Sequence, residues 1–136
     1  MYSEVGGLRR ISWHPSSKYI AIPVKNTVAM YSRDGEKVSV FQSDGHERRV
    51  SITAWSPNGD YLASVSIDGE MLIWNTNSLE SVARFKHTTM VTSLAWNPAG
   101  NEIAWSDALG RFSVWRKPVP DVKNLTAPSA GLKEEV

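Results

Sequence analysis

The feature that most constrains this sequence is a tryptophan motif that recurs at nearly constant spacing. Trp13, Trp55 and Trp96 each lie two residues before a proline, and they are separated by 42 and 41 residues. In each copy a polar turn, a short apolar segment, a second turn and a segment that ends in an aromatic residue follow the motif. One four-stranded blade of a β-propeller takes about 40 to 45 residues. The spacing therefore predicts three consecutive blades.

The segments inside each copy have the composition of β-strands. They are four to six residues long, rich in β-branched and aromatic side chains and bounded by turn residues, so they are too short for helices. They lie at 19–24, 28–31 and 37–41 in the first copy, at 61–66, 71–74 and 81–85 in the second, and at 102–106 and 112–115 in the third. The third copy lacks a fourth strand because Pro118 and Pro120 follow it, and proline cannot donate to a strand ladder.

We therefore expect an all-β fold, a partial propeller of about three four-stranded blades of which the last is incomplete. The expected organisation is a lead-in at residues 1–8, blades at 9–45, 46–86 and 87–116, and a tail at 117–136. The tail is rich in proline and polar residues, which predicts a disordered linker. Propellers usually close rings of about four to eight blades. The open faces of three blades thus predict that the isolated chain aggregates or folds only in part.

Composition excludes several kinds of function. The chain has 136 residues and a net charge of +1, which argues against sequence-independent binding of nucleic acid or of a membrane surface. It has no cysteine, so disulfides, thiolate metal sites and cysteine nucleophiles are excluded. No run is long and apolar enough to cross a membrane, and the N-terminus lacks the regions of a signal peptide. These features predict a nuclear or cytoplasmic protein.

No residue set in the sequence predicts catalysis, a metal site or a cofactor. The three histidines have no carboxylate or second imidazole at ligand spacing. The Gly-x-Ser-x-Gly motif, glycine-rich phosphate loops and the His-Glu-x-x-His helix are absent. We therefore expect a protein that is not an enzyme and that needs no cofactor.

The second copy resembles the WD-repeat family. Gly45-His46 before its first strand and Trp74-Asn75 after its third match the Gly-His and Trp-Asp signatures of that family. The resemblance implies a buried, hydrogen-bonded network inside the blade. The matching positions are His46, Ser64 or Ser66, Asp68 and Trp74. The network is physically reasonable, because a buried carboxylate is tolerated when imidazole, hydroxyl and indole donors meet its lone pairs.

The other two copies carry only part of this set. In the third copy His87 and Trp115 remain, but Leu109 stands where the aspartate would fall. In the first copy Lys25 and Tyr31 take the places of the aspartate and the tryptophan. We therefore expect these two blades to be held by packing more than by the network.

A few residues are candidates for contacts with a partner or with DNA. Arg9-Arg10 and Arg48-Arg49 each precede a first strand, so they would recur on similar rims of the propeller. Their alternative role is that of solvated surface residues. Trp105 occupies a strand position where the other copies carry Ile22 and Ser64, and this deviation suggests an exposed contact on the rim. The tryptophans of the repeated motif are expected to lie in the core.

Some deviations from the common repeat resemble one particular family. Ala21-Ile-Pro-Val24 and Ser106-Asp-Ala-Leu-Gly110 resemble the WD repeat and HMG-box DNA-binding proteins, the chromosome-transmission-fidelity replisome adaptors. The resemblance covers the last blades of their propeller and the start of a linker, without the trimerising domain, the polymerase-contacting region or the HMG box. It implies a platform in a nuclear adaptor that links the replicative helicase to DNA polymerase α–primase on chromatin. It also implies a trimeric full-length parent and roles in DNA repair and the mitotic cell cycle.

Two other interpretations stay open at this point. One is a WD-repeat scaffold subunit of an unrelated transcriptional or trafficking complex. The other is an enzyme built on a propeller, for which the chain offers no nucleophile or ligand set. The coding sequence beyond both ends would separate the first interpretation from the adaptor, because an adaptor requires further repeats before Met1 and a second domain after Val136.

Overall fold

The computed structural model describes residues 10–42 and 45–118, and every named element in these ranges is a β-strand. The lead-in at 1–8, Arg9 and the tail from residue 119 lie outside the described residues. The first sheet contains, in order, β1 (Ser12–Trp13), β2 (Tyr19–Val24), β3 (Thr27–Ser32) and β4 (Lys37–Phe41). The second contains β5 (Val50–Trp55), β6 (Tyr61–Ser66), β7 (Glu70–Asn75) and β8 (Ser81–Lys86). The third contains β9 (Val91–Trp96), β10 (Glu102–Asp107) and β11 (Phe112–Arg116).

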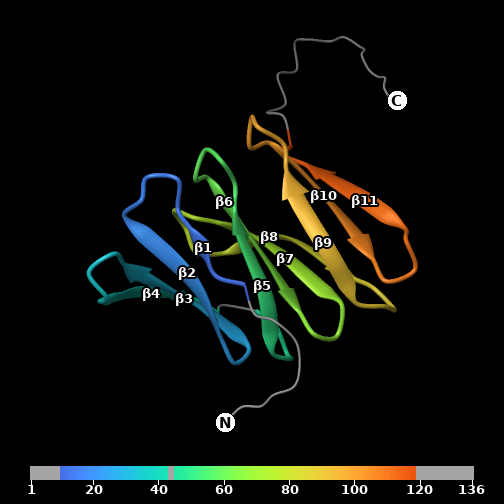
Figure 1. Ribbon diagram of the computed structural model, residues 1–136, viewed down its shortest axis with the longest axis horizontal. Helices are drawn as coiled ribbons and strands as arrows, with labels where there is room; N and C mark the ends of the chain where they lie inside the picture. The colour runs from blue at the N-terminus through green and yellow to red at the C-terminus, as the bar shows by residue number, and fades with distance from the viewer. Residues whose placement is uncertain (1–9, 43–44, 119–136) are drawn as a thin grey trace.

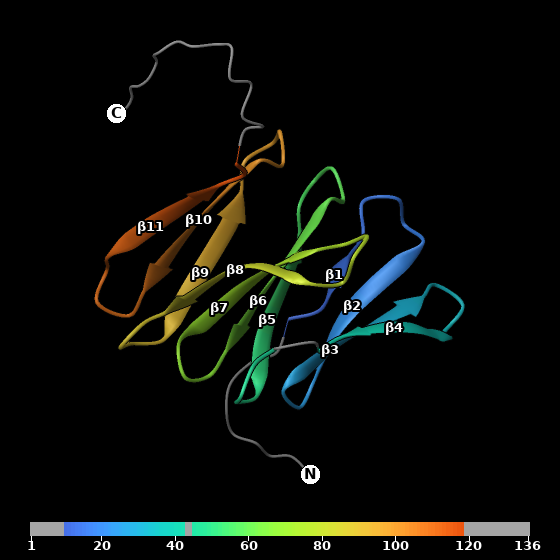
Figure 2. The same ribbon diagram turned by 180° about the vertical axis from the view of Figure 1, so that it is seen from behind.

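Each sheet is an antiparallel meander, in which every strand after the first pairs with the one before it in the chain. The three sheets stand side by side, with β5–β8 between the other two (Figure 1, Figure 2). The all-β partial propeller expected from the repeat is confirmed, with two four-stranded sheets followed by a three-stranded one. The described residues contain no helix, and therefore no helix that could cross a membrane.

The strand ladders carry irregularities at matching places. The β3–β4 pairing shifts at Tyr31, and the β7–β8 pairing shifts at Trp74, which occupies the same position in the next sheet. An extra residue in one strand bends that strand and increases its twist. The recurrence shows that the outer strands of the first and second sheets are shaped by the same local device.

The two central strands of the middle sheet, β6 and β7, are buried on both faces. All six residues of β6 and five of the six residues of β7 are buried. Toward the first sheet, the core consists of Ala21, Val28, Met30, Phe41, Val50, Trp55, Leu62, Leu72 and Trp74. Toward the third sheet, it consists of Tyr61, Ala63, Val65, Met71, Ile73, Val91, Ile103 and Trp105. Successive residues of a strand point to opposite faces, so a strand such as β6, in which every residue is buried, has a packed neighbour on each side.

Each interface between sheets contains the same hydrogen bond. The indole N–H of Trp55 donates to the carbonyl of Ser12 at 3.1 Å, and that of Trp96 donates to the carbonyl of Ala54 at 3.0 Å. Donor and acceptor lie 43 and 42 residues apart, close to one repeat. A buried indole needs an acceptor for its N–H. The repeated tryptophan therefore both fills the interface and fixes the height of one sheet against the next.

The turn after each motif is also fitted to the preceding sheet. Gly59 has a φ of +79°, and a side chain there would place its Cβ 2.6 Å from Nε2 of His14. Gly100 has the same φ and would meet Asn58 at 2.6 Å. In the first sheet the equivalent residue is Ser17, which has a φ of +66°. Positive φ and close approach both favour glycine, and at Gly59 the two requirements act together.

We predict that Gly59→Ala destabilises the chain more than Gly110→Ala. Gly110 has a φ of +85°, but a Cβ at this position would have no neighbouring atom within 4 Å. Alanine there meets only the backbone cost of the left-handed region, about 1–2 kcal/mol. At Gly59 the collision with the His14 ring adds to that cost. Urea unfolding of both variants measures the difference, and equal losses of stability would show that the contact with His14 is unimportant.

Candidate functional site

A chain of buried polar side chains crosses the middle sheet. The indole N–H of Trp74 donates to the hydroxyl of Ser64 at 2.8 Å, and this hydroxyl lies 2.6 Å from Nε2 of His46. On the other side of the ring, Nδ1 of His46 lies 3.3 Å from a carboxylate oxygen of Glu70. All four side chains are buried. Of the two serines left open by the resemblance, the structure places Ser64 in this chain.

The contacts assign the protons. Ser64 accepts from the indole of Trp74, and the acceptor within reach of its own hydroxyl hydrogen is Nε2 of His46. That arrangement leaves the imidazole proton on Nδ1, which faces Glu70. This neutral tautomer satisfies the contacts at Ser64, whereas Nδ1 of His46 and Oε1 of Glu70 face each other at 3.3 Å without a well-aligned hydrogen bond.

Burial keeps this imidazole neutral. Removal of the ring from water lowers the pKa of His46 below its ordinary value of 6.5, although the nearby Glu70 carboxylate acts in the opposite direction. The second oxygen of Glu70 is paired with the guanidinium of Arg84 on β8. Charge is thus balanced at the partly exposed end of the network, and the interior end carries only neutral groups.

Asp68 takes a different place from the one that the resemblance implied. Its carboxylate accepts hydrogen bonds from Ser66 and from Lys86, and Glu70 supplies the carboxylate beside His46. Asp68 lies in the β6–β7 turn with 25% of its side chain exposed, whereas only 4% of the Glu70 side chain is exposed. Partial burial alone would raise the pKa of Asp68, but the hydrogen bonds from Ser66, Lys86 and the Glu70 backbone lower it.

Glu70 was missed in the sequence although a signal was present. Strand residues that are two apart share a face, so Glu70 lies on the same face as Leu72 and Trp74. A carboxylate on an otherwise apolar strand face requires a partner. Arg84, directly across from Leu72 on the neighbouring strand, provides one.

In the third sheet the equivalent histidine, His87, is hydrogen-bonded by a different type of side chain. Trp105 occupies the position of Ser64, nine residues after the motif tryptophan, and its indole N–H donates to Nε2 of His87 at 2.8 Å. Trp105 is 3% exposed and packs against Phe85 of the middle sheet with ring centroids 4.8 Å apart. The expectation of an exposed rim contact at Trp105 is therefore corrected. A large indole replaces the serine and reaches the histidine directly.

Trp115 does not take the role that its match to Trp74 implied. Its ring packs edge-on against Tyr61 at 5.3 Å and against Trp96 at 6.3 Å. Tyr61 and Trp96 are themselves stacked, with ring centroids 6.1 Å apart. Because Trp105 already occupies the donor position beside His87, Trp115 contributes an aromatic cluster between the second and third sheets.

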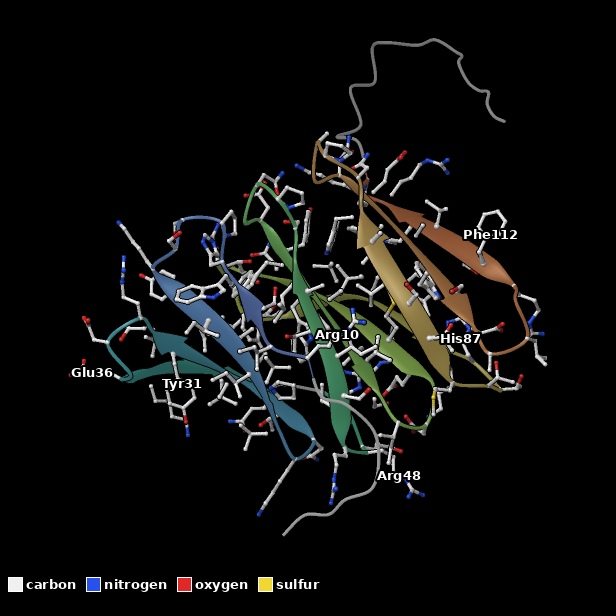
Figure 3. All side chains as sticks on the ribbon, viewed as in Figure 1. Arg10, Tyr31, Glu36, Arg48, His87 and Phe112 are labelled. Carbon is white, nitrogen blue, oxygen red and sulfur yellow. The ribbon has the colours of Figure 1, made fainter. Side chains whose placement is uncertain are left out.

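The arginine pairs do not lie at equivalent places. The backbone of Arg10 pairs with Ile52 in the interior of β5, and its N–H donates to the carbonyl of Ser51 at 2.8 Å. Arg48 and Arg49 lie in the loop before β5, where the carbonyl of Arg49 accepts from the N–H of Ile67. Figure 3 shows Arg10 beside the middle of the sheets and Arg48 near their ends. The expectation of matching rims is therefore corrected.

A shallow hollow of about 400 Å³ opens between the second and third sheets. It is lined by Lys86, His87, Thr88, Trp105, Asp107, Arg111, Phe112 and Ser113. Its charged groups have internal partners, because Lys86 pairs with Asp68 at 3.3 Å and Arg111 pairs with Asp107 at 2.8 Å. Burial alone would raise the pKa of Asp107, but hydrogen bonds from Arg111 and the Leu109 backbone lower it to about 2. Within 10–42 and 45–118 no group of three or more metal-ligating side chains occurs.

We predict that the chain loses stability as the pH falls below about 6.5, and that His46→Gln removes this part of the pH dependence. The folded state holds His46 neutral while the unfolded chain becomes protonated near the ordinary pKa of 6.5, so acid favours the unfolded state. Urea unfolding of both proteins between about pH 8 and pH 5 measures the two slopes. Equal slopes would contradict the assignment.

A separate loss is expected at lower pH. The pKa values of Asp68 and Asp107 are lowered in the folded state, so their stabilising contribution is present above the ordinary value of 3.8 and is lost as the pH falls toward about 2. Asp107→Asn should therefore change unfolding below about pH 4 and leave the slope near neutrality intact.

We also predict that Trp105→Phe costs more stability than Trp115→Phe. Both changes keep an aromatic ring, but the first removes the donor to His87 and leaves a half-buried acceptor unpaired, at a cost of about 1–3 kcal/mol. Denaturant unfolding gives the two losses, and the ¹⁵N shift of the His87 ring reports the missing bond. A larger loss for Trp115→Phe would support the role first expected of Trp115.

Comparison with known proteins agrees with this architecture. The family model described as IFT140 first beta-propeller matches residues 2–120. WD repeat and HMG-box DNA-binding protein 1 of Xenopus laevis is 38% identical over 109 residues, which are 77% of this chain and 10% of the relative. Minichromosome loss protein 1 of Schizosaccharomyces pombe is 28% identical over 128 residues, 93% of this chain and 15% of the relative. The Intraflagellar transport protein 122 homolog of Danio rerio is 26% identical over 117 residues, 85% of this chain and 9% of the relative.

The chain spans between 9% and 15% of the length of these three relatives. The match to the family model nevertheless extends over all three sheets and includes the repeated tryptophans Trp13, Trp55 and Trp96. The chain therefore belongs to the WD-repeat β-propeller family represented by the first β-propeller of IFT140, and it is related to WD repeat and HMG-box DNA-binding protein 1.

Proposed function

We propose that this chain is a non-catalytic platform for protein interactions. The observation that carries the proposal is that the buried and charged side chains of the candidate site have their partners inside the protein. The buried groups His46 and Glu70 face each other inside a blade, and Lys86, Asp107 and Arg111 of the hollow each have an ion-pair partner within the protein. Groups held in this way stabilise a rigid scaffold and are not poised to react with a substrate.

We further propose that the full-length parent is a nuclear replication adaptor that links the replicative helicase to DNA polymerase α–primase on chromatin, as a trimer. The resemblance of Ala21-Ile-Pro-Val24 and Ser106-Asp-Ala-Leu-Gly110 supports this role. So do the two relatives whose names refer to HMG-box DNA binding and to minichromosome loss. DNA contact through Arg10, Arg48 and Arg49 stays a secondary hypothesis, because the structure does not gather them at equivalent positions.

Co-purification of the tagged full-length parent from replicating cells tests the adaptor role. We expect helicase subunits and polymerase α to be recovered together with the parent. A parent that carries Trp55→Ala is the matched control for the blades, since the change removes both core volume and the bond to Ser12. Recovery of neither partner by the unaltered parent would refute the adaptor role and would leave the scaffold proposal standing.

A trafficking scaffold is the second candidate. The family model takes its description from IFT140, and the Intraflagellar transport protein 122 homolog matches 85% of the chain. Fluorescence localisation separates the candidates, because the adaptor should accumulate on replicating chromatin whereas a trafficking subunit should concentrate in cilia or the cytoplasm.

A further inference from the structure

Asn58 and Gly59 form a chemically reactive pair in the turn between β5 and β6. Asn58 is the one asparagine of the sequence that a glycine follows. The backbone nitrogen after an asparagine is placed to attack the side-chain amide carbon through a succinimide ring, and glycine has no Cβ to shield that nitrogen. Asn58 is exposed, so water has access to the products of such an attack. The pair is therefore a candidate site of covalent modification.

The side chain of Asn58 is held against the third sheet. Its Oδ1 accepts from the hydroxyl of Ser56 at 2.7 Å and from the N–H of Asp60 at 3.2 Å. Its Nδ2 donates to the carbonyl of Ala99 in the β9–β10 turn at 3.2 Å. The amide also lies close to Gly100, where a Cβ would approach Cγ of Asn58 to 2.6 Å. The carbon that would be attacked is thus fixed by contacts with the neighbouring sheet.

The backbone of Gly59 is held on the other side, against the first sheet. Its N–H donates to the carbonyl of Ser56 at 2.9 Å, so the attacking nitrogen is already engaged within the turn. A Cβ at Gly59 would lie 2.6 Å from Nε2 of His14 in the β1–β2 turn. The turns β1–β2, β5–β6 and β9–β10 lie at the same end of the three sheets (Figure 1). Ring closure therefore requires the middle turn to separate from its neighbours.

We propose that Asn58 is a site of spontaneous deamidation whose rate is set by the contact between the second and third sheets. The nitrogen of Gly59 forms a bond to Cγ of Asn58, the bond from Cγ to Nδ2 breaks, and ammonia leaves with the proton of the Gly59 amide. Water then opens the cyclic imide at either of its carbonyl carbons, which gives aspartate or isoaspartate. Regions of a folded protein open locally with free energies below that of global unfolding. The reaction proceeds from the molecules in which this contact is open.

Either product weakens the contact that protects the pair. A carboxylate at position 58 has no N–H to donate to the carbonyl of Ala99, and it brings a negative charge toward that oxygen. Isoaspartate also adds a methylene group to the backbone of the turn. The lengthened turn cannot keep both of its residues in place between His14 and Gly100. Because ammonia has been lost, the modified molecule does not return to the original interface.

Incubation of the 136-residue chain in mildly alkaline buffer tests the proposal. Peptide mass spectrometry measures the mass gain at Asn58 over time, with and without guanidinium chloride. We expect the conversion to be roughly tenfold or more slower without denaturant, because the contact is then closed in most molecules. Asn58→Ser, which places at this position the residue type that the first sheet carries at Ser16, should abolish the mass gain. Equal rates in the two conditions, or no conversion in denaturant, would overturn the proposal.

A pair of glycine variants in the third sheet tests whether the contact between sheets sets the rate. Gly100→Ala pushes a methyl group against Asn58, whereas Gly110→Ala meets no atom within 4 Å, and both glycines have a positive φ. We expect Gly100→Ala to accelerate the conversion of Asn58 several-fold in native buffer and to leave the rate in denaturant unchanged. A rate equal to that of Gly110→Ala would show that the third sheet does not control the reaction.

The unaltered chain gives a second measurement that does not depend on the folding of a variant. Local opening exposes less surface than global unfolding and therefore depends less steeply on denaturant. We expect low concentrations of guanidinium chloride, well below the unfolding midpoint seen by near-ultraviolet circular dichroism, to change the rate at Asn58 only slightly. A rate that follows the global unfolding transition at every concentration would show that the whole fold must open, and would overturn control by this one contact.

Discussion

The structure depends on the packing of two tryptophans, Trp55 and Trp96, each from the first strand of its sheet, against the sheet before it. The indole of Trp96 packs against the core cluster that includes Ala63 and donates its N–H to the backbone carbonyl of Ala54, so one side chain fixes the position of the third sheet on the second. The burial of the two central strands of the middle sheet on both faces follows from two such contacts. Without the second, Ala63 and Val65 of β6 would be exposed to water.

The polar chain in the middle blade adds specificity to this packing. Buried polar side chains are costly unless they find partners, and the contacts of Ser64 with Trp74 and His46 require β6, β7 and the loop before β5 to be in one register. His46, Ser64 and Trp74 each come from a different one of these segments. A slip of one residue in any of them would turn a buried partner to the wrong face. This polar network therefore acts mainly by destabilising incorrect pairings of the strands, and less by stabilising the correct one.

Much of the fold could be predicted from the sequence, because the spacing of the repeated tryptophans indicates the number of blades and the prolines after the last strand indicate where the third blade stops. The role of Glu70 could not, because it depends on which of two nearby carboxylates is drawn inward, and the pairing of Lys86 with Asp68 decides this in three dimensions. Trp105 was misjudged for a similar reason. A deviation from a repeat indicates only that the environment differs, and the buried solution depends on Phe85, which lies across the interface on the preceding sheet.

The same replacement has a consequence for how a chain of similar units keeps its order. At equivalent positions of their second strands, the second sheet carries a serine hydroxyl bonded to Trp74 and the third carries an indole bonded to His87. Ser64 lies 2.8 Å from the Trp74 indole nitrogen, which leaves little room for an indole, and a serine in place of Trp105 would leave a void beside Phe85. The two interfaces therefore require different side chains. The departures from the repeat thus make the interfaces between blades chemically distinct, and this distinction favours one order of the blades.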